Sequence, residues 1–391
     1  MGTESPTLQA MPAHAVAPAQ LRRSWSQRWN EARNRLLLNG NFNRWAASFP
    51  LTRPIVNREA RGLFDLLAGF VYSQVLQACV ELDLFATLAS GSQTVDSLAA
   101  KFALSPDAAR RLLLAATSLK LVTRYSDDTF SLGPRGAMIL ANPGIAAMVR
   151  HHAMLYADLR SPVSLLRGVA PPTNLAGYWS YASSDAPASL DGSSVADYSC
   201  LMAASQPLVS AEILAAYPIE RHRCLLDVGG GDGTFLSAAA ACAPSLQLRL
   251  FDLPAVAERA RARLAADGYG LRTQVTGGSF LTGELPRGAD LVSLIRVAYD
   301  HDDATVMTLL RAIRRALPDD GTLLIAEPMA GTPGAEPIGE AYFGFYLLAM
   351  GSGRSRTRAE LSGMARAAGF SVVRPVATRT PMLACLIVCR P

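Results

Sequence analysis

The chain has 391 residues, half of them hydrophobic and only 18% charged, which suits two domains with large buried cores and excludes an intrinsically disordered protein. The net charge is +5, and residues 1–60 carry all of it, because eight arginines there stand against three glutamates. The rest of the chain is neutral in sum, so the basic character belongs to an N-terminal arm.

The sequence argues against a membrane-spanning or secreted protein and against a metal-binding or disulfide-linked one. No apolar run approaches the roughly 18–20 residues of a membrane-spanning helix, and the N-terminus lacks the apolar core of a signal peptide, so we expect a cytoplasmic protein. The six cysteines are scattered without CxxC spacing, and no cluster of His and carboxylates has metal-ligand spacing. We therefore expect buried, reduced cysteines and no metal.

The N-terminal arm combines Arg with Trp. Residues 1–20 are rich in Pro and Ala, and we expect them to be disordered. On the helix that follows, Leu21, Trp25, Trp29 and Leu36 fall near one face. A basic, Trp-bearing amphipathic helix can lie on an anionic membrane surface, and it can equally pack on the body or on a partner subunit.

The segment 61–140 has the pattern of a winged helix. One helix starts near Asp96, a second starts at Ser105-Pro106, and a short hairpin turns at Ser126–Asp128. Winged helices often bind DNA, but the candidate recognition helix, Pro106–Leu119, carries only two adjacent arginines and begins with an aspartate. Phosphate contacts need more positive charge, so we expect no nucleic acid as a partner.

After a mostly helical stretch that ends near residue 222, strands and helices alternate. The strands are predicted at 224–228, 247–252, 272–276, 289–295, 321–327, 370–375 and 382–389. The helices are predicted near 234–243, 254–266, 303–317, 338–350 and 357–368. Short apolar strands with helices between them indicate a parallel sheet covered on both faces. The last two strands follow closely and indicate a hairpin, so the final strand should be antiparallel.

Glycines follow the first of these strands in the stretch LLDVGGGDGTF. They stand at Gly229, Gly231 and Gly233, with Thr234 where the third glycine of a dinucleotide fingerprint would be, and the motif of nucleotide triphosphatases is missing. Glycines here let the backbone pass close to a ligand, where a Cβ would collide.

An acidic residue lies at the end of each of the first two strands. Asp227 precedes the glycines, and Asp252 ends the second strand, where a carboxylate can accept both hydroxyls of a ribose. The pattern D-x-G-x-G-x-G followed by this second acid is typical of methyltransferases that use S-adenosylmethionine.

Over roughly residues 61–391 the chain resembles the plant-type S-adenosylmethionine-dependent O-methyltransferases. The shared motifs are DVGGGDG, FDLP, GGSFLTGELP, RVAYDHDD, IAEP and RTRAELSGMARAAGF. The resemblance implies an α/β fold with a Rossmann-like seven-stranded methyltransferase domain at 223–391. A mainly helical winged-helix dimerisation and substrate domain at 61–222 precedes it, behind the basic arm at 1–60. It also implies a homodimer.

The resemblance further implies which residues hold S-adenosylmethionine. Asp252 should bind the ribose, Ser279 and Phe280 stand where relatives contact adenine, and Arg296 should lie beside the cofactor. The full set implied is Asp227, Gly229, Gly231, Asp252, Leu253, Ser279, Phe280 and Arg296.

The catalytic apparatus of the family is altered. Most relatives end the fourth strand in HDW and use the His to deprotonate a phenol, whereas here Tyr299 takes the His position and His301 the Trp position. One supporting Glu is kept as Glu327, and the other is replaced by Ser355. An aliphatic alcohol tolerates this loss, because it gives up its proton during or after methyl transfer. We therefore expect Tyr299 to orient the acceptor hydroxyl and His301 to take its proton.

Longer stretches, among them HHAMLYADLRSPVSLLRG and YSCLMAASQPLVSAEIL, look like the carotenoid branch of the family. That branch methylates the tertiary 1-hydroxyl of an acyclic carotenoid in purple photosynthetic bacteria. The resemblance thus implies a hydrophobic acceptor, and an acceptor that resides in a membrane would explain peripheral membrane contact by the N-terminal arm. The alternatives are a bacteriochlorophyllide C-methyltransferase and, from another class, a winged-helix regulator with a ligand-binding domain.

Two other groups are weaker candidates for the acceptor site. His151 and His152 are adjacent on a predicted helix, so at most one should face the acceptor pocket. The resemblance places Tyr72, Ser73 and Gln74 on a helix that contacts either the substrate or the partner subunit.

Overall fold

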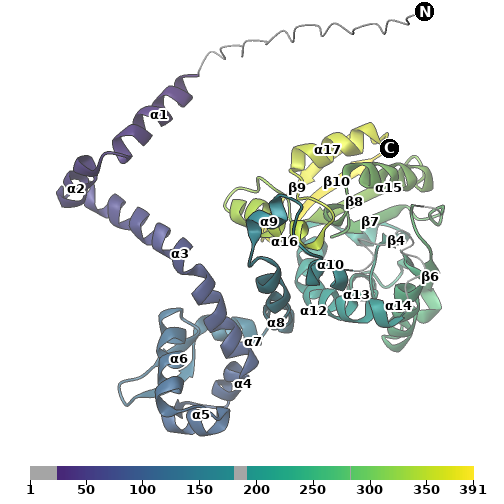
Figure 1. The fold of residues 1–391 in the computed structure, drawn as a ribbon. Helices are drawn as coiled ribbons and strands as arrows, with labels where there is room; N and C mark the ends of the chain where they lie inside the picture. The colour runs from purple at the N-terminus through teal and green to yellow at the C-terminus, as the bar shows by residue number, and fades with distance from the viewer. Residues whose placement is uncertain (1–23, 180–191, 282) are drawn as a thin grey trace, which may run out of the picture. The chain divides into compact units, whose positions relative to one another are not determined.

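The structure is a computed structural model that describes residues 24–179, 192–281 and 283–391 (Figure 1). The expectation of disorder for residues 1–20 lies outside the described residues. The chain divides into two compact units, residues 1–73 and 74–391. Each unit is described separately.

The described part of the first unit is helical and exposes apolar side chains. Helix α1 (Trp25–Leu37) starts at a capping box formed by Ser24 and Gln27, and α2 (Gly40–Ser48) starts at Asn39. Helix α3 (Arg53–Glu81) begins in this unit. The exposed large apolar residues are Trp25, Trp29, Leu36, Leu37, Leu38, Trp45, Phe49, Leu51, Ile55, Leu63, Phe64, Leu66, Leu67, Phe70 and Val71.

Two described helices are long and apolar enough to cross a membrane by length and composition alone, Arg53–Glu81 and Tyr198–Ala216. The sequence contains no uninterrupted apolar run of this length, because Arg and Asn stand among the apolar residues of α3, and the expectation from the sequence concerned only such runs. Core helices of soluble proteins meet the same criterion.

The winged-helix prediction for the start of the second unit is confirmed. Helices α4 (Leu84–Ala89), α5 (Val95–Phe102) and α6 (Pro106–Ser118) pack with a small antiparallel sheet in the order β1-β3-β2. Its strands are β1 (Gln93–Thr94), β2 (Val122–Arg124) and β3 (Thr129–Leu132). Ser105 caps α6 as expected, but Thr94 rather than Asp96 caps α5. Arg110, one of the two adjacent arginines, forms an ion pair with Asp128.

Helices α7 (Pro134–Leu140), α8 (Pro143–Asp158), α9 (Pro162–Leu166), α10 (Asn174–Tyr178) and α12 (Gly192–Ala216) connect this domain to the large sheet. The large sheet has seven strands in the order β6-β5-β4-β7-β8-β10-β9. They are β4 (Cys224–Val228), β5 (Gln247–Asp252), β6 (Thr273–Gly277), β7 (Leu291–Ile295), β8 (Thr322–Glu327), β9 (Val372–Val376) and β10 (Cys385–Arg390).

Strands β6, β5, β4, β7 and β8 run parallel to one another. Strand β10 lies between β8 and β9 and is antiparallel to both. The predicted antiparallel final strand is thus confirmed. Helices α15 (Asp303–Ala316) and α17 (Arg358–Ala367) cover one face, and α12, α13 (Thr234–Cys242) and α14 (Pro254–Ala266) cover the other (Figure 1). After β8 the chain forms a π-helical turn (Pro337–Tyr342) that continues as α16 (Phe343–Met350).

The cysteines are all free, but the expectation that all are buried is wrong for two of them. Cys200 and Cys242 are exposed. Both lie on helices, α12 and the last turn of α13, where the sequence around them is apolar but the side chain points outward.

Candidate active site

A cavity of about 290 Å³ lies at the carboxyl ends of the parallel strands. All eight residues predicted to hold the cofactor line it, and so does His301. The lining residues that sequence reasoning missed come from the end of α10, from α12, from the turn after β7 and from the loop after α16. They include Trp179, Tyr198, Met202, Gln206, Asp300 and Ser352. Tyr198, Met202 and Gln206 follow one another at intervals of four residues on α12, in a stretch that the sequence analysis had singled out. Asp300 directly follows Tyr299, whereas Trp179 and Ser352 belong to no short motif.

The glycine loop and the second-strand aspartate meet at one wall of the cavity. Gly229 has φ of +69°, and a Cβ there would lie 2.6 Å from Val297 Cγ2, so only glycine fits without a shift. The N–H groups of Gly231 and Leu253 donate to the Asp252 carboxylate at 2.8 and 2.7 Å. These two bonds fix the carboxylate at the strand end, in reach of the cavity.

The Asp227 side chain is buried, and Asp252 is half-buried at the cavity wall. Burial raises the pKa of Asp252 to about 6, although its two backbone N–H donors oppose the rise. Burial also raises the pKa of Asp227 to about 7, and the Asp252 charge adds to this, while the hydroxyl of Ser293 donates to Asp227 at 2.6 Å. Two carboxyls on the wall of one cavity favour a ligand that donates hydrogen bonds to them.

The loop after β6 also lines the cavity, next to the end of β5. Ser279 is buried and accepts a hydrogen bond from the Leu281 N–H at 3.3 Å. The ring of Phe280 meets the ring of His301 edge to face, with centroids 5.4 Å apart. Burial lowers the pKa of His301 to about 4. An aromatic ring and a neutral imidazole thus face the cavity together, as suits a flat heterocycle.

Arg296 connects the end of β7 to α12. Its φ is +56°, and its guanidinium donates to Ser205 Oγ at 2.9 Å, to Gln206 Oε1 at 3.4 Å and to Met202 Sδ at 3.1 Å. Strained backbone of this kind at a cavity wall is typical of functional sites. A fixed positive charge therefore stands between the cavity and α12.

Tyr299 and Glu327 lie behind the cavity wall to which Arg296 belongs, and a hydrogen bond joins them. The Tyr299 N–H donates to Glu327 Oε2 at 2.9 Å, so the carboxyl supports the turn Ala298–Asp300 that follows β7. Burial raises the pKa of Glu327 to about 8. Burial also raises the pKa of the Tyr299 phenol above its usual value, so this phenol is protonated at neutral pH. Its ring meets the ring of Phe343 at 5.7 Å.

An aromatic cluster surrounds Tyr299 on the side of α8 and α16. Tyr346 Oη accepts a hydrogen bond from Trp179 Nε1 at 2.8 Å and shares one with His151 Nε2 at 2.7 Å. His152 Nε2 lies 2.8 Å from Tyr342 Oη. Both histidines therefore contact tyrosines of the same segment, 337–350, and neither lines the cavity. That at most one of them faces the acceptor stays a prediction.

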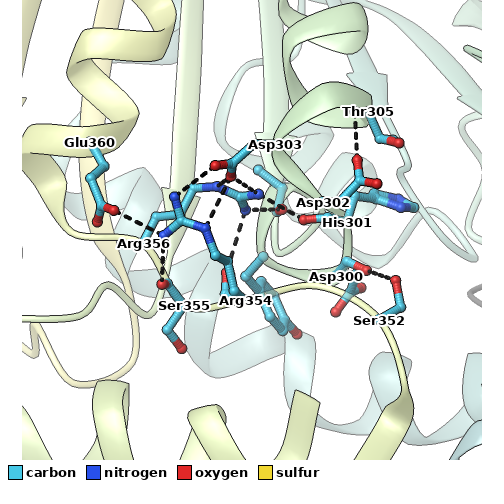
Figure 2. A network of polar contacts seen from close by, with 12 residues as sticks. Asp300, His301, Asp302, Asp303, Thr305, Ser352, Arg354, Ser355, Arg356 and Glu360 are labelled. Carbon is cyan, nitrogen blue, oxygen red and sulfur yellow. Dashed lines mark hydrogen bonds and ion pairs between the residues drawn. The ribbon is translucent and has the colours of Figure 1, made fainter. Parts of the chain in front are cut away.

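A polar network ties the turn after β7 to the loop before α17 (Figure 2). Arg356 is 1% exposed, and it pairs with Asp303 at 2.7 Å and donates to the carbonyls of Ala298 and His301 at 2.7 and 2.8 Å. Arg354 pairs with Asp303 and with Glu360, each at 2.9 Å. The Ser355 hydroxyl is buried without a hydrogen-bond partner.

A doubly wound sheet whose glycine turn and second-strand aspartate wall one cavity defines the Rossmann-like class of enzymes that bind an adenosyl cofactor. Within that class, the chain belongs to the O-methyltransferase family. An O-methyltransferase domain matches residues 177–371, and an O-methyltransferase dimerisation domain matches residues 64–142. The predictions of fold class, enzyme class and S-adenosylmethionine as cofactor are thereby confirmed.

Named relatives agree with this assignment. The chain is 45% identical to a demethylspheroidene O-methyltransferase of Cereibacter sphaeroides, covering 87% of this chain and 89% of the relative. It is 39% identical to a demethylspheroidene O-methyltransferase of Rhodobacter capsulatus, covering 90% and 88%. Both matched domains are domains of O-methyltransferases, and both relatives are methyltransferases, so the alternative of a winged-helix regulator has no support.

Solved structures share the fold. Human N-acetylserotonin methyltransferase in complex with SAM has a TM-score of 0.69 at 21% identity, covering 85% of this chain and 97% of that one. The calicheamicin-biosynthesis methyltransferase in its SAH-bound form has a TM-score of 0.68 at 27% identity, covering 85% and 98%.

Proposed function

We propose that this enzyme transfers the methyl group of S-adenosylmethionine to the tertiary hydroxyl of an acyclic hydroxycarotenoid of the demethylspheroidene type. The observation that carries this proposal is the replacement at Tyr299, because a protonated, buried phenol stands where a phenol-methylating relative has its base. The names of the relatives at 45% and 39% identity support the same acceptor class.

The surroundings of Tyr299 suit a long apolar acceptor. Its cluster combines aliphatic and aromatic side chains, and its buried members are Leu155, Leu165, Leu175, Trp179, Tyr198, Leu201, Val256, Tyr299, Tyr346, Leu347, Ala349 and Met350. Aromatic faces pack well against a conjugated polyene, and apolar side chains provide most of this surface.

For the cofactor we propose the roles implied by the sequence. Asp252 accepts the ribose hydroxyls, Ser279 and Phe280 contact the adenine, and Arg296 stands beside the cofactor. Asp227, Gly229, Gly231 and Leu253 complete the wall around the same cavity, whose lining supports these roles.

In the transfer step the donor is already activated by its sulfonium charge, so the protein has to align the acceptor oxygen with the methyl group. We infer that the Tyr299 hydroxyl orients the acceptor, and that Glu327 is a positioning residue, because it holds the backbone of Tyr299. The edge contact of His301 with Phe280 supports a place beside the adenine more than the role of proton acceptor.

The acceptor class is tested with labelled S-adenosylmethionine and two alcohols, a 1-hydroxy acyclic carotenoid in detergent and a simple phenol. The expected result is a labelled methyl ether of the carotenoid and no reaction of the phenol. A protein that methylates the phenol faster would contradict the proposed acceptor while leaving the family assignment intact.

We propose that the exposed apolar residues of the first unit contact two different surfaces. On α3, Phe64, Leu67 and Phe70 lie within the matched dimerisation domain, which favours a second copy of the chain as their cover. On α1, Trp25 and Trp29 stack at 6.2 Å with 80% and 61% of their surface exposed, among arginines. This arrangement favours an anionic membrane surface, from which a water-insoluble acceptor would be collected.

A further inference from the structure

Asp300 lies where the cofactor cavity meets the aromatic cluster. It ends the short turn Ala298–Asp300 after β7, is 9% exposed and lines the cavity together with Arg296. The charge of Asp300 also acts on tyrosines of the aromatic cluster. Burial raises the pKa of Tyr299 and of Tyr346, and in both cases the Asp300 carboxylate adds to the rise. Trp179 and Tyr198 line the same cavity and belong to the aromatic cluster, so Asp300 lies on the wall where acceptor and cofactor would meet.

The two neighbours of Asp300 in the sequence are less suited to receive a proton. The Tyr299 phenol is already protonated, and its raised pKa makes it a donor. The ring of His301 contacts Phe280 and leaves the turn in a different direction from the side chain of Asp300 (Figure 2).

We propose that Asp300 accepts the proton that the acceptor hydroxyl loses during methyl transfer. This inference rests on the proposed function. The bond between sulfur and the methyl carbon breaks as a bond between the acceptor oxygen and that carbon forms. The sulfonium becomes a neutral thioether, the O–H proton passes to the Asp300 carboxylate, and the O–H electron pair stays on the ether oxygen.

A carboxylate is sufficient for this step although it would be a poor base toward a free alcohol. As the new bond forms, positive charge develops on the acceptor oxygen and its proton becomes strongly acidic. The acceptor does not have to be deprotonated in advance, so the group that takes the proton needs position rather than high basicity.

The loop 352–356 supplies that position. Ser352 Oγ donates to the Asp300 carbonyl at 2.7 Å, and the Arg354 N–H donates to the Tyr299 carbonyl at 2.9 Å. Gly353 has φ of +79°, and a Cβ there would lie 2.1 Å from the Tyr299 carbonyl oxygen. Only glycine permits this approach, so the loop fixes the backbone from which the Asp300 side chain extends.

The test compares Asp300→Asn and Asp300→Ala with Asp319→Asn, a matched change at a side chain that is 99% exposed. Single-turnover methylation of a 1-hydroxy carotenoid is measured together with calorimetric binding of S-adenosylmethionine. We expect Asp300→Asn to slow the turnover by roughly 10²–10⁴-fold, with cofactor affinity nearly unchanged. Formate should restore part of the rate of Asp300→Ala and none of the rate of Asp300→Asn, where the amide fills the space.

Each remaining outcome has a defined meaning. A wild-type protein that binds S-adenosylmethionine but forms no carotenoid ether overturns the proposed function and the role of Asp300 with it. An active wild type with an equally active Asp300→Asn overturns the role of Asp300 alone. A cofactor affinity that falls as much as the rate makes Asp300 a cofactor ligand and also overturns the proposal. Retained cofactor binding shows that each variant is folded.

Discussion

Neighbouring residues in the turn after β7 have different ligands in our proposal, His301 the cofactor and Asp300 the acceptor. We predict that His301→Ala weakens S-adenosylmethionine binding by about 0.5–1.5 kcal/mol, because the edge contact with Phe280 is lost. The methyl-transfer rate at saturating cofactor should fall by less than about tenfold, since general acid–base catalysis by this ring would be worth roughly 10²–10⁴-fold. Calorimetry and single-turnover rates separate the two effects. A large loss of rate at unchanged affinity would return His301 to the role expected from its sequence position.

The affinity for the cofactor should depend on pH through Asp252. Burial raises its pKa to about 6, and ribose hydroxyls donate to its ionised form, so affinity should increase as the pH rises through about 6. Asp252→Asn should remove this dependence and weaken binding by about 1.5–3 kcal/mol. Calorimetry with S-adenosylhomocysteine, which lacks the sulfonium charge, is the control. Equal affinities at about pH 5 and pH 8 for the wild type would contradict the assignment.

The raised pKa of Asp252 also affects the stability of the folded protein. A carboxyl whose pKa is higher in the folded than in the unfolded state stabilises the fold at low pH, and this contribution is lost as the pH rises from its ordinary value of 3.8 through about 6. The ligand-free protein should therefore lose stability over this range, and bound cofactor should offset the loss.

Among the elements, the loop before α17 depends on one buried guanidinium. Arg356→Ala should lower the free energy of unfolding by about 2–4 kcal/mol, because two buried carbonyls and Asp303 lose their donor. Arg356→Lys should cost less, since it keeps the charge without the fork of donors. Denaturant unfolding measures both. Arg358→Ala, an exposed change in the same segment, should stay within about 0.5 kcal/mol, and a similar loss there would show a general effect of the loop.

The strands were predictable because each is an apolar run bounded by turn residues, and buried parallel strands need no alternation. The glycine loop and Asp252 were predictable because they follow consecutive strands. The contact of Arg356 with the turn after β7 was not, because 55 residues separate Arg356 from His301 and only the folded sheet brings them together. Pairing of both His151 and His152 with tyrosines of one segment was missed for the same reason.

At the scale of the whole molecule, the arm should matter for membranes and the body for chemistry. Deleting residues 1–45 removes Trp25, Trp29 and Trp45 and six arginines. Each Arg near an anionic leaflet adds about 1 kcal/mol to binding, so the truncated protein should sediment less with anionic liposomes. Methylation of membrane-embedded carotenoid should slow, while cofactor affinity stays the same.

Mass measurements give the control for this deletion. If α1 and α2 belong to the dimer contact instead, the truncated protein should become monomeric and still sediment with liposomes as before. That result would contradict the membrane role of the arm and leave the rest of the enzyme unaffected.

The position of β10 sets a condition on how the sheet folds. Cys385–Arg390 lies between β8 and β9, so the strand that comes last of the seven in the sequence has to fit between two strands that precede it. The pairing of β8 with β10 joins residues that are far apart in the chain, and contacts of this kind form slowly because a long loop has to close first. Until β10 is in place, β8 and β9 have unpaired edges, and such edges favour aggregation. Deleting Cys385–Arg390 should therefore yield a chain that aggregates and does not bind the cofactor.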